Sequence, residues 1–261
     1  MNNVKLNQSV TKAIAILRAA GSPAGGETAS GLARETGLPW ATAVRLIRTL
    51  ESEGFLYRLP QDDRYVLGFE LLRLSRAYDQ TRVLAAIARP ALERLNDEVE
   101  ETVNVTLVRA DGSLEVVEQI DPPRMIRTMD LHGQPYPLHA TSIGKLLLAS
   151  YDDALLDEYL SSPLERHAPA TITEPDALRE EVERVRATGY SVAVDELEEG
   201  LAALSVGIKD ADGELFAMLT VSGPSFRFDE EARFAALEPA RSAADAIERL
   251  VAGRAVSRSL A

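Results

Sequence analysis

Three polar residues in the second half of the chain have the side chains of a hydrolytic triad: His139, Ser142 and Asp195. In such a set the histidine activates the serine hydroxyl as a nucleophile. However, His139 and Ser142 stand three residues apart at the predicted start of one helix, and no G-x-S-x-G pattern surrounds Ser142. The sequence also contains no cysteine, no phosphate-binding glycine loop and no cluster with metal-ligand spacing. We therefore expect no enzyme activity, no cofactor and no metal site.

The start of this predicted helix is better suited to binding an anion. The first N–H groups of a helix have no partner within it, and the helix dipole favours a negative charge there. Ser142 lies at this point of the sequence "HATSIGKLLLAS". His139, three residues earlier, is interpreted as a capping or packing residue.

A second chemistry is indicated by basic residues in the segment 37–55, "GLPWATAVRLIRTLESEGF". The side of this predicted helix that lies opposite its apolar face holds Arg45 and Arg48, with Trp40 at its leading end. Exposed arginines at this spacing can contact phosphates and base edges of nucleic acid. The apolar positions recur at helical spacing and predict one buried face: Ala43, Leu46, Ile47 and Leu50.

The distribution of charge supports a contact with a polyanion at the front of the chain only. The formal net charge of the 261-residue chain is −13, and no apolar run is long enough to span a membrane. Residues 1–80 nevertheless contain ten basic and eight acidic residues, a net charge of +2, so the rest of the chain has −15. Such asymmetry indicates that the first part alone meets nucleic acid.

Three short helices and a hairpin are predicted before residue 69. The second helix is capped by Thr28 and ends at Gly37, and the third ends at Gly54. The runs "FLYRL" and "RYVLG" flank the turn "PQDD" and predict a hairpin. This order is that of a winged helix-turn-helix, in which the third helix enters the major groove. The first helix, predicted over 9–20, should turn these residues toward the core: Val10, Ala13, Ile14 and Leu17.

Within this domain, the hairpin and the third helix supply the candidate DNA-binding residues. Arg45 is expected to contact the phosphate backbone, and Trp40, Thr42 and Arg48 are candidates for base contacts, although a lone tryptophan can equally be a packing residue. Arg58 and Arg64 flank the wing and could reach phosphates or the minor groove. The full predicted set is Trp40, Ala41, Thr42, Arg45, Arg48, Arg58 and Arg64.

Strands and helices alternate through the remainder of the chain. The pattern from 69 to 100 is helical, with an expected interruption at Pro90. Antiparallel strands are predicted around the turns Asp111-Gly112 and Asp212-Gly213, "RMIRTM" is predicted as a further strand, and a long helix covers 229–251. The sequence therefore predicts an α+β fold with a winged domain (1–68), a linker or dimerisation helix (69–85) and a larger domain (86–261).

Several blocks, in this order and spacing, resemble the IclR family of bacterial transcriptional regulators over nearly the whole chain. They include "SVTKAIAIL", "SGLARETGLPWATAVRLIRTLESEGFL", "RYVLGFELLRL", "HATSIGKLLLA", "TITEPDALREEVERVRATGY" and "DGELFAMLTVSGP". The resemblance implies a winged-helix DNA-binding domain, a dimerising linker helix and a GAF-like effector-binding domain. It also implies dimers or tetramers on pseudo-palindromic operators. Relatives usually have a basic residue and a serine where this chain has Trp40 and Ala41.

The resemblance also implies a site for a small organic acid. In glyoxylate- and pyruvate-responsive relatives, an aspartate and a cysteine that contact the ligand fall on Ala193 and Ala203 here. Because two polar contacts are replaced by methyl groups, we expect a larger or more apolar acid than glyoxylate, for example an aromatic one. The expected effector-binding residues are Ser142, Ile143, Gly144, Leu201, Ala203, Thr220 and Ser222, with Met125 and Met129 at the mouth.

These features together predict a ligand-responsive transcriptional regulator of the cytoplasm that contacts double-stranded operator DNA, a small organic acid and further copies of itself. A repressor is expected. The alternatives are an activator of a catabolic operon, and a small-molecule-binding interaction module without sequence-specific DNA binding. The sequence leaves open the identity of the effector, the target genes and the choice between dimer and tetramer.

Overall fold

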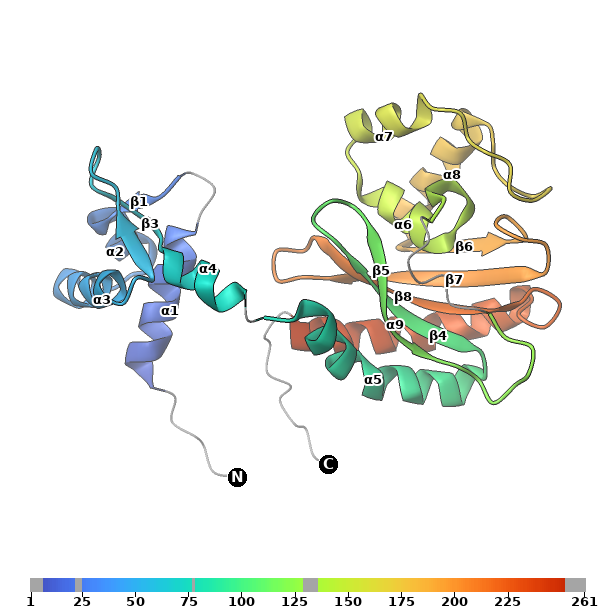
Figure 1. Ribbon diagram of the computed structural model, residues 1–261, viewed down its shortest axis with the longest axis horizontal. Coiled ribbons are helices and arrows are strands. Elements are labelled where there is room, and N and C mark those ends of the chain that lie inside the picture. Colours follow the sequence, from blue (N-terminus) through green and yellow to red (C-terminus); the bar gives the residue numbers. More distant parts are fainter. Residues whose placement is uncertain (1–6, 22–24, 77, 129–135, 252–261) are drawn as a thin grey trace. The chain divides into compact units, whose positions relative to one another are not determined.

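The computed structural model describes residues 7–21, 25–76, 78–128 and 136–251. The chain divides into two compact units, Met1–Asp79 and Gln80–Ala261. In Figure 1 the first unit is blue to teal and the second runs from green to red. The division falls inside the range 69–85 that the sequence pattern assigned to a linker.

The N-terminal unit is built on three helices, and the predicted capping residues lie at their ends. The Thr28 hydroxyl accepts a hydrogen bond from the N–H of Gly31 at 3.1 Å, so this residue is the predicted N-cap. Gly37 and Gly54 follow the second and third helices in the left-handed conformation, with φ of 65° and 75°. The helices are α1 (Gln8–Ala20), α2 (Ala29–Glu35) and α3 (Trp40–Ser52).

The predicted core face of α1 was partly wrong. Ile16 is fully buried, together with Ala19 and Ala20, whereas Val10 and Ile14 are exposed. The buried positions pack against α2 and α3. Apolar residues occur on two overlapping faces of this helix, and only the position of its neighbours decides which face is covered.

The wing is a three-stranded antiparallel sheet in the order β1-β3-β2. The predicted hairpin is confirmed, and a short additional strand pairs Glu27 with Tyr65. Tyr65 packs into the core of the unit. The strands are β1 (Glu27–Thr28), β2 (Leu56–Arg58) and β3 (Arg64–Leu67).

The helical stretch after the wing breaks earlier than predicted. It consists of α4 (Phe69–Ser75) and α5 (Gln80–Val99), so residues 69–85 do not form one helix. The expected interruption at Pro90 was also wrong, because α5 continues through it. Pro90 is exposed, so water can donate a hydrogen bond to the carbonyl that the proline leaves without a partner. Buried residues before and after Pro90 pack the helix against its neighbours: Leu84, Ala88, Ala91, Leu92 and Leu95.

The C-terminal unit contains a five-stranded antiparallel sheet in the order β5-β4-β8-β7-β6. The α+β prediction is confirmed. Residues 124–128 of the predicted strand "RMIRTM" are not a strand, because the Ile126 carbonyl accepts a hydrogen bond from the Arg227 guanidinium at 2.8 Å instead of joining a ladder. The strands are β4 (Thr102–Val108), β5 (Leu114–Ile120), β6 (Tyr190–Val194), β7 (Leu201–Lys209) and β8 (Leu215–Pro224).

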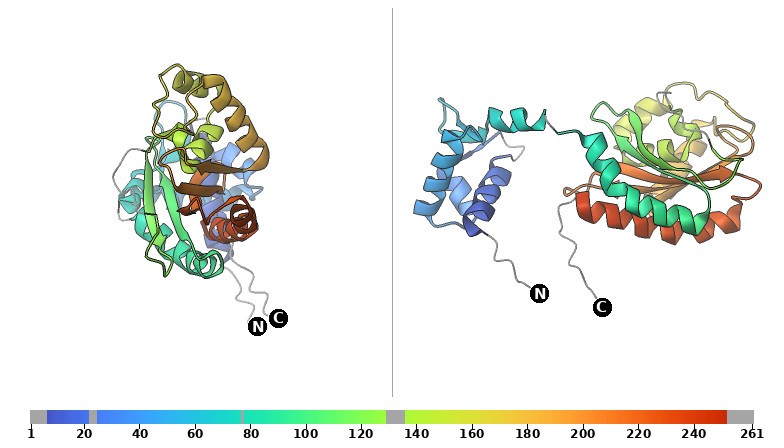
Figure 2. Two further views of the ribbon diagram at one scale, coloured as in Figure 1. Left: turned by 90° about the vertical axis from the view of Figure 1, so that its right-hand side faces the viewer. Right: turned by 60° about the horizontal axis from the view of Figure 1, so that its bottom comes forward.

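The two faces of this sheet are covered by different helices. α5 and α9 lie side by side on one face, and α6, α7 and α8 lie beyond the other (Figures 1 and 2). Alternation along the strands divides the side chains, so that Leu204 and Leu219 enter the apolar core with α5 and α9, while Ser205 and Thr220 face α6. The remaining helices are η1 (Leu138–Ala140), α6 (Ser142–Ser150), α7 (Asp153–Leu160), α8 (Pro175–Thr188) and α9 (Glu230–Val251).

Candidate functional site

The first candidate site is the outer face of α3. Ala43, Ile47 and Leu50 are buried in the core of the N-terminal unit, as predicted. Burial of this face turns the other predicted residues outward. Trp40 is 58% exposed, and Thr42 is half-buried at the edge. A shallow groove runs along the outer face of the helix, lined by Trp40, Ala41, Val44, Arg45, Arg48, Thr49 and Ser52.

Within the part of the chain that the structure describes, the two arginines of α3 lack the ion-pair partners that the arginines of the wing have. Arg45 and Arg48 are exposed, and neither forms an ion pair with any of the described residues. Their guanidinium groups are therefore available to an external anion. An α-helix fits the major groove of B-DNA, where arginine can contact phosphates or bond guanine.

Both wing arginines are already paired with aspartates at the tip of the hairpin. Arg58 Nη2 lies 2.9 Å from Asp63 Oδ1, and Arg64 Nε lies 3.2 Å from Asp62 Oδ2. The hydrogen bond to Asp63 raises the pKa of the Arg58 guanidinium. All four side chains are largely exposed, so these pairs contribute little stability and can open. A phosphate that approaches the wing must replace the aspartates.

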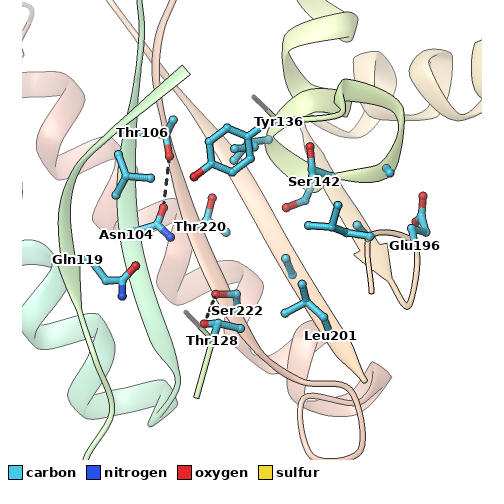
Figure 3. Close-up of a pocket in the computed structure, with 17 residues that line it drawn as sticks. Asn104, Thr106, Gln119, Thr128, Tyr136, Ser142, Glu196, Leu201, Thr220 and Ser222 are labelled. Atoms are coloured by element: carbon cyan, nitrogen blue, oxygen red, sulfur yellow. Dashed lines mark hydrogen bonds between the residues drawn. The ribbon is translucent and has the colours of Figure 1, made fainter. Parts of the chain in front are cut away.

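The second candidate site is a cavity of about 90 Å³ between the sheet and the start of α6 (Figure 3). This is several times the roughly 10–15 Å³ that one water molecule needs. Segments far apart in the sequence meet here, because each strand turns alternate side chains toward α6. The lining includes the residues labelled in Figure 3: Asn104, Thr106, Gln119, Thr128, Tyr136, Ser142, Glu196, Leu201, Thr220 and Ser222.

A row of polar residues crosses the whole sheet on the face that carries the cavity. Gln119 pairs with Asn104, Asn104 with Thr220, Thr220 with Ser205, and Ser205 with Ser191, one residue from each of the five strands. Cross-strand partners have side chains on the same face of the sheet. Three members of the row, Gln119, Asn104 and Thr220, line the cavity and make the β5–β4–β8 part of its floor hydrophilic.

The β7 side of this row is bonded to α6. Ser205 Oγ lies 2.7 Å from Ser142 Oγ and 2.8 Å from Thr220 Oγ1, and the Ser191 hydroxyl donates to the carbonyl of Ser142. All four residues are buried. This chain of hydroxyls fixes the first turn of α6 against the sheet.

The first turn of α6 presents its free amides at this point. The Thr141 hydroxyl caps the helix by accepting from the N–H of Gly144 at 3.1 Å, and the Thr141 carbonyl accepts from the N–H of Lys145. The N–H groups of Ser142 and Ile143 come earlier in the turn, where no helical carbonyl is available. Both residues line the cavity, so an anion placed there would meet the positive end of the helix.

Gly144 has a different role from the predicted one. It does not line the cavity, and its amide is already used by the cap. A Cβ atom at this position would lie 2.2 Å from the Cα of Leu138, so a side chain would push α6 away from η1. The glycine is required by the close approach of the backbone.

A buried ion pair lies beside the same helix. Lys145 is 1% exposed, and its Nζ lies 2.7 Å from Glu196 Oε1 and 3.4 Å from Glu181 Oε1. Burial raises the pKa of the Glu196 carboxyl, and the Lys145 charge opposes that rise. Burial also acts to raise the pKa of Glu181, but Arg184 and Lys145 lower it overall. Glu196 Oε2 has no hydrogen-bond partner among the described residues.

Most of the predicted effector residues meet in this cavity, but Gly144 and Met125 do not. Ser142, Ile143, Leu201, Ala203, Thr220 and Ser222 line it. Met125 is 98% exposed and is not part of the lining, because residues 124–128 do not form the strand that would have directed it inward. Met129 lies outside the described residues.

The polar residues that sequence reasoning missed are mainly Asn104, Thr106, Gln119, Thr128 and Glu196. Alternation along "TVNVTLV" marks Asn104 and Thr106 as one polar face within an apolar strand, a signal that could have identified them. No local pattern places Gln119 or Thr128 beside them.

The catalytic hypothesis finds no support in the arrangement of its three residues. His139 Nε2 donates to the carbonyl of Glu165 at 2.8 Å, and its Nδ1 is 3.0 Å from the Tyr159 hydroxyl. The Ser142 hydroxyl instead meets Ser205, and Asp195 accepts from the N–H of Gly200 at 2.7 Å. Within the described ranges, no three metal-binding side chains cluster. In the same part of the chain, no helix has the length and apolar composition needed to cross a membrane.

Both units match models of one protein family. Residues 9–60 match the IclR helix-turn-helix domain, and residues 76–249 match the bacterial transcriptional regulator IclR C-terminal domain. The chain belongs to the IclR family. IclR proteins are DNA-binding transcriptional regulators and not enzymes, which agrees with the groove on α3 and the absence of a triad among His139, Ser142 and Asp195.

Characterised IclR relatives cover most of the chain. The Pca regulon regulatory protein of Pseudomonas putida is 32% identical over 87% of this chain and 78% of its own length. The transcriptional repressor IclR of Escherichia coli strain K12 is 29% identical over 86% of this chain and 82% of its own. An IclR homologue from Microbacterium hydrocarbonoxydans, solved in complex with 4-hydroxybenzoate, is 26% identical, with a TM-score of 0.60 over 94% of this chain and 99% of that one.

Proposed function

We propose that this IclR-type regulator is a repressor that acts as a homodimer or tetramer, and that a small organic acid in the cavity of the C-terminal unit changes its affinity for an operator. The observation that supports it most directly is the pairing of two sites in one chain. One is a helix face with two unpaired arginines, and the other is a cavity at a helix N-terminus. A cytoplasmic location is part of the proposal, because the operator DNA lies there.

On the DNA side, Arg45 and Arg48 of α3 are proposed to make the principal contacts. Arg45 contacts the phosphate backbone, and Arg48, Thr42 and Trp40 contact base edges, with Ala41 allowing close approach. The 58% exposure of Trp40 supports base contact over packing. Arg58 and Arg64 remain proposed phosphate contacts of the wing, formed by exchange of their aspartate partners.

The effector is proposed to be a monocarboxylate larger than glyoxylate, with an aromatic acid as the favoured class. Its carboxylate would lie at the amides of Ser142 and Ile143 and the hydroxyls of Thr220 and Ser222. Ala203 and Leu201 provide apolar contact for the body of the ligand. The relative that binds 4-hydroxybenzoate supports this class.

Self-association is supported by apolar side chains around α4. This helix has no buried residue, and Phe69 is 79% exposed, with Leu72 and Leu74 also exposed. A helix with this surface needs a cover in water, and a second copy of the chain would supply it. Two winged units in one dimer would then contact the half-sites of a near-palindromic operator.

A salt titration of binding to labelled DNA from upstream of the chain's own gene tests the proposal. Sequence-selective binding with a steep salt dependence is expected, and release by a carboxylic acid would identify repression. Binding no tighter than to random DNA would contradict operator recognition. Ligand-enhanced transcription from the same promoter would favour the activator alternative.

A further inference from the structure

We propose that Asn104 and Gln119 form a second recognition point in the cavity, which binds an uncharged hydroxyl group at the far end of a carboxylic acid effector. The inference rests on the proposed function, since it takes the cavity as the effector site. It defines the ligand as a hydroxylated monocarboxylate and assigns its specificity to two residues outside the α6 region.

The two amides are neighbours on one face of the sheet. Asn104 of β4 and Gln119 of β5 are direct cross-strand partners, and both line the cavity. Figure 3 shows both side chains projecting on the cavity side of these strands. Cross-strand partners have Cβ atoms about 5 Å apart, so one small group can contact both amides.

The hydrogen bonds that the two amides already make leave one polar atom of each amide without a partner in the described part of the chain. Asn104 Oδ1 accepts from the Thr106 hydroxyl at 3.4 Å, and Gln119 Nε2 donates to Asp121 Oδ1 at 2.8 Å. Asn104 Nδ2 and Gln119 Oε1 have no hydrogen-bond partner among the described residues. On the β7 side of the polar row, by contrast, the hydroxyls of Thr220 and Ser205 are hydrogen-bonded to each other.

A donor beside an acceptor matches a hydroxyl group. A ligand O–H can donate to Gln119 Oε1 while its oxygen accepts from Asn104 Nδ2. A carboxylate only accepts, so it would leave Gln119 Oε1 without a donor, and an ammonium only donates, so it would leave Asn104 Nδ2 without an acceptor. Because both amides are uncharged, a second carboxylate would also gain no charge compensation from them.

The position of the pair in the sheet sets the length of the ligand. The ligand hydroxyl would lie between Asn104 and Gln119, about two and a half strand spacings or about 12 Å from Ser205, and Ser142 stands directly over Ser205. Two hydrogen bonds of about 3 Å, one at each end, shorten this span. A six-membered ring with para substituents fills the remaining distance, whereas a two-carbon oxoacid is too short to reach both ends.

The test uses the full-length chain and isothermal titration with three probes: 4-hydroxybenzoate, 4-methylbenzoate of similar size, and benzene-1,4-dicarboxylate. The wild type should bind the hydroxyl probe about 5- to 100-fold more tightly than the methyl probe, as expected for a buried hydrogen-bonded group. The dicarboxylate should bind most weakly.

Asn104→Leu and Gln119→Leu should reduce that preference to within about twofold, while affinity for 4-methylbenzoate is kept or rises. Glu118→Gln is the matched control. It changes the preceding residue of β5, whose side chain pairs with Arg89 on the other face, so the preference should be unchanged. Unaltered operator binding by each variant verifies that the chain is folded.

Three results would overturn the inference: equal binding of the hydroxyl and methyl probes to the wild type, a preference that survives both leucine variants, or tightest binding of the dicarboxylate. Failure of all three probes to bind a wild-type chain that still binds its operator would also overturn it, and would leave the regulator intact. Probe binding with the expected preference, but without any change in operator affinity, would contradict the proposed function and not the recognition point.

Discussion

Lys145 Nζ lies 2.7 Å from Glu196 Oε1, and this buried contact joins α6 to the loop that follows β6. The same loop is tied down by the Thr171 hydroxyl, which donates to the carbonyl of Glu196 at 2.6 Å. Since Ser142 and Ile143 begin α6 and Glu196 lines the cavity, the ion pair holds two walls of the proposed effector site together. An ion pair in this position stabilises the geometry of the site.

Lys145→Met should destabilise the chain by about 3–5 kcal/mol at pH 8, because it leaves a buried carboxylate without its cation. Removing Lys145 also raises the pKa of Glu196 further above its unfolded value. A group with a raised folded-state pKa contributes stability that is present at low pH and lost as pH rises through that pKa. The deficit of the variant should therefore shrink between pH 8 and pH 5.5. Urea unfolding at both pH values measures this deficit. The control is Arg179→Met, which removes an exposed ion pair and should lower the free energy of unfolding by less than about 1 kcal/mol. A deficit independent of pH would contradict the assignment to Glu196.

Arg45→Ala should weaken operator binding for every sequence in a panel, because a phosphate contact is independent of the base. The slope of log K against log salt should fall by about 0.9, the value for one phosphate neutralised. Fluorescence anisotropy over a salt series provides the measurement. Arg249→Ala, an exposed arginine of α9, serves as the control for loss of one positive charge. Identical slopes for the two variants would argue against a phosphate contact by Arg45.

Trp40→Ala tests whether Trp40 contacts DNA bases or serves as a packing residue of the N-terminal unit. Because the side chain is more than half exposed, its loss should cost less than about 1 kcal/mol of unfolding free energy. Operator affinity should fall selectively, with changed preference at one or two base pairs of each half-site. Thermal unfolding and a panel of single-base operator variants test both parts. A large drop in stability with unchanged base preference would identify Trp40 as a packing residue.

Ser222→Val should impair the effector response and leave binding of the ligand-free protein to its operator unchanged. The hydroxyl of Ser222 lies 2.9 Å from that of Thr128 at the edge of the cavity, and valine cannot replace that bond. Titration of the operator complex with the releasing acid should show affinity for the acid reduced by roughly fivefold or more. If affinity for the acid were unchanged, the proposed site would be in the wrong place.

Leu72→Asp should weaken self-association, since it places a charge on the exposed apolar surface of α4. Analytical ultracentrifugation should detect a shift toward monomer, and operator affinity should fall with it because half-sites then bind singly. Leu155→Asp, on the exposed side of α7 in the other unit, is the matched control and should leave both unaltered. A variant with wild-type sedimentation would exclude this part of α4 from the interface.

The sequence by itself determined most of the elements and their order. Helical spacing in α3, strand alternation in β4, β7 and β8, and turn residues such as Gly37, Gly54 and Gly112 are local properties, because backbone periodicity and left-handed turns depend on residues close in the chain. The same local patterns turned Arg45 outward and placed Thr220 and Ser222 on one face of a strand.

The tertiary structure alone decided which of these residues share a site. Val10 and Ile14 are exposed and Pro90 lies within a continuous helix, because neighbouring elements fix which face is covered.

The pairing of Asn104 with Gln119, like the contact of Ser142 with Ser205, depends on strand register and on the packing of α6 against the sheet. Register between strands is set by the burial of one whole face of the sheet. That face is formed by residues from all five strands, so no short stretch of sequence specifies it.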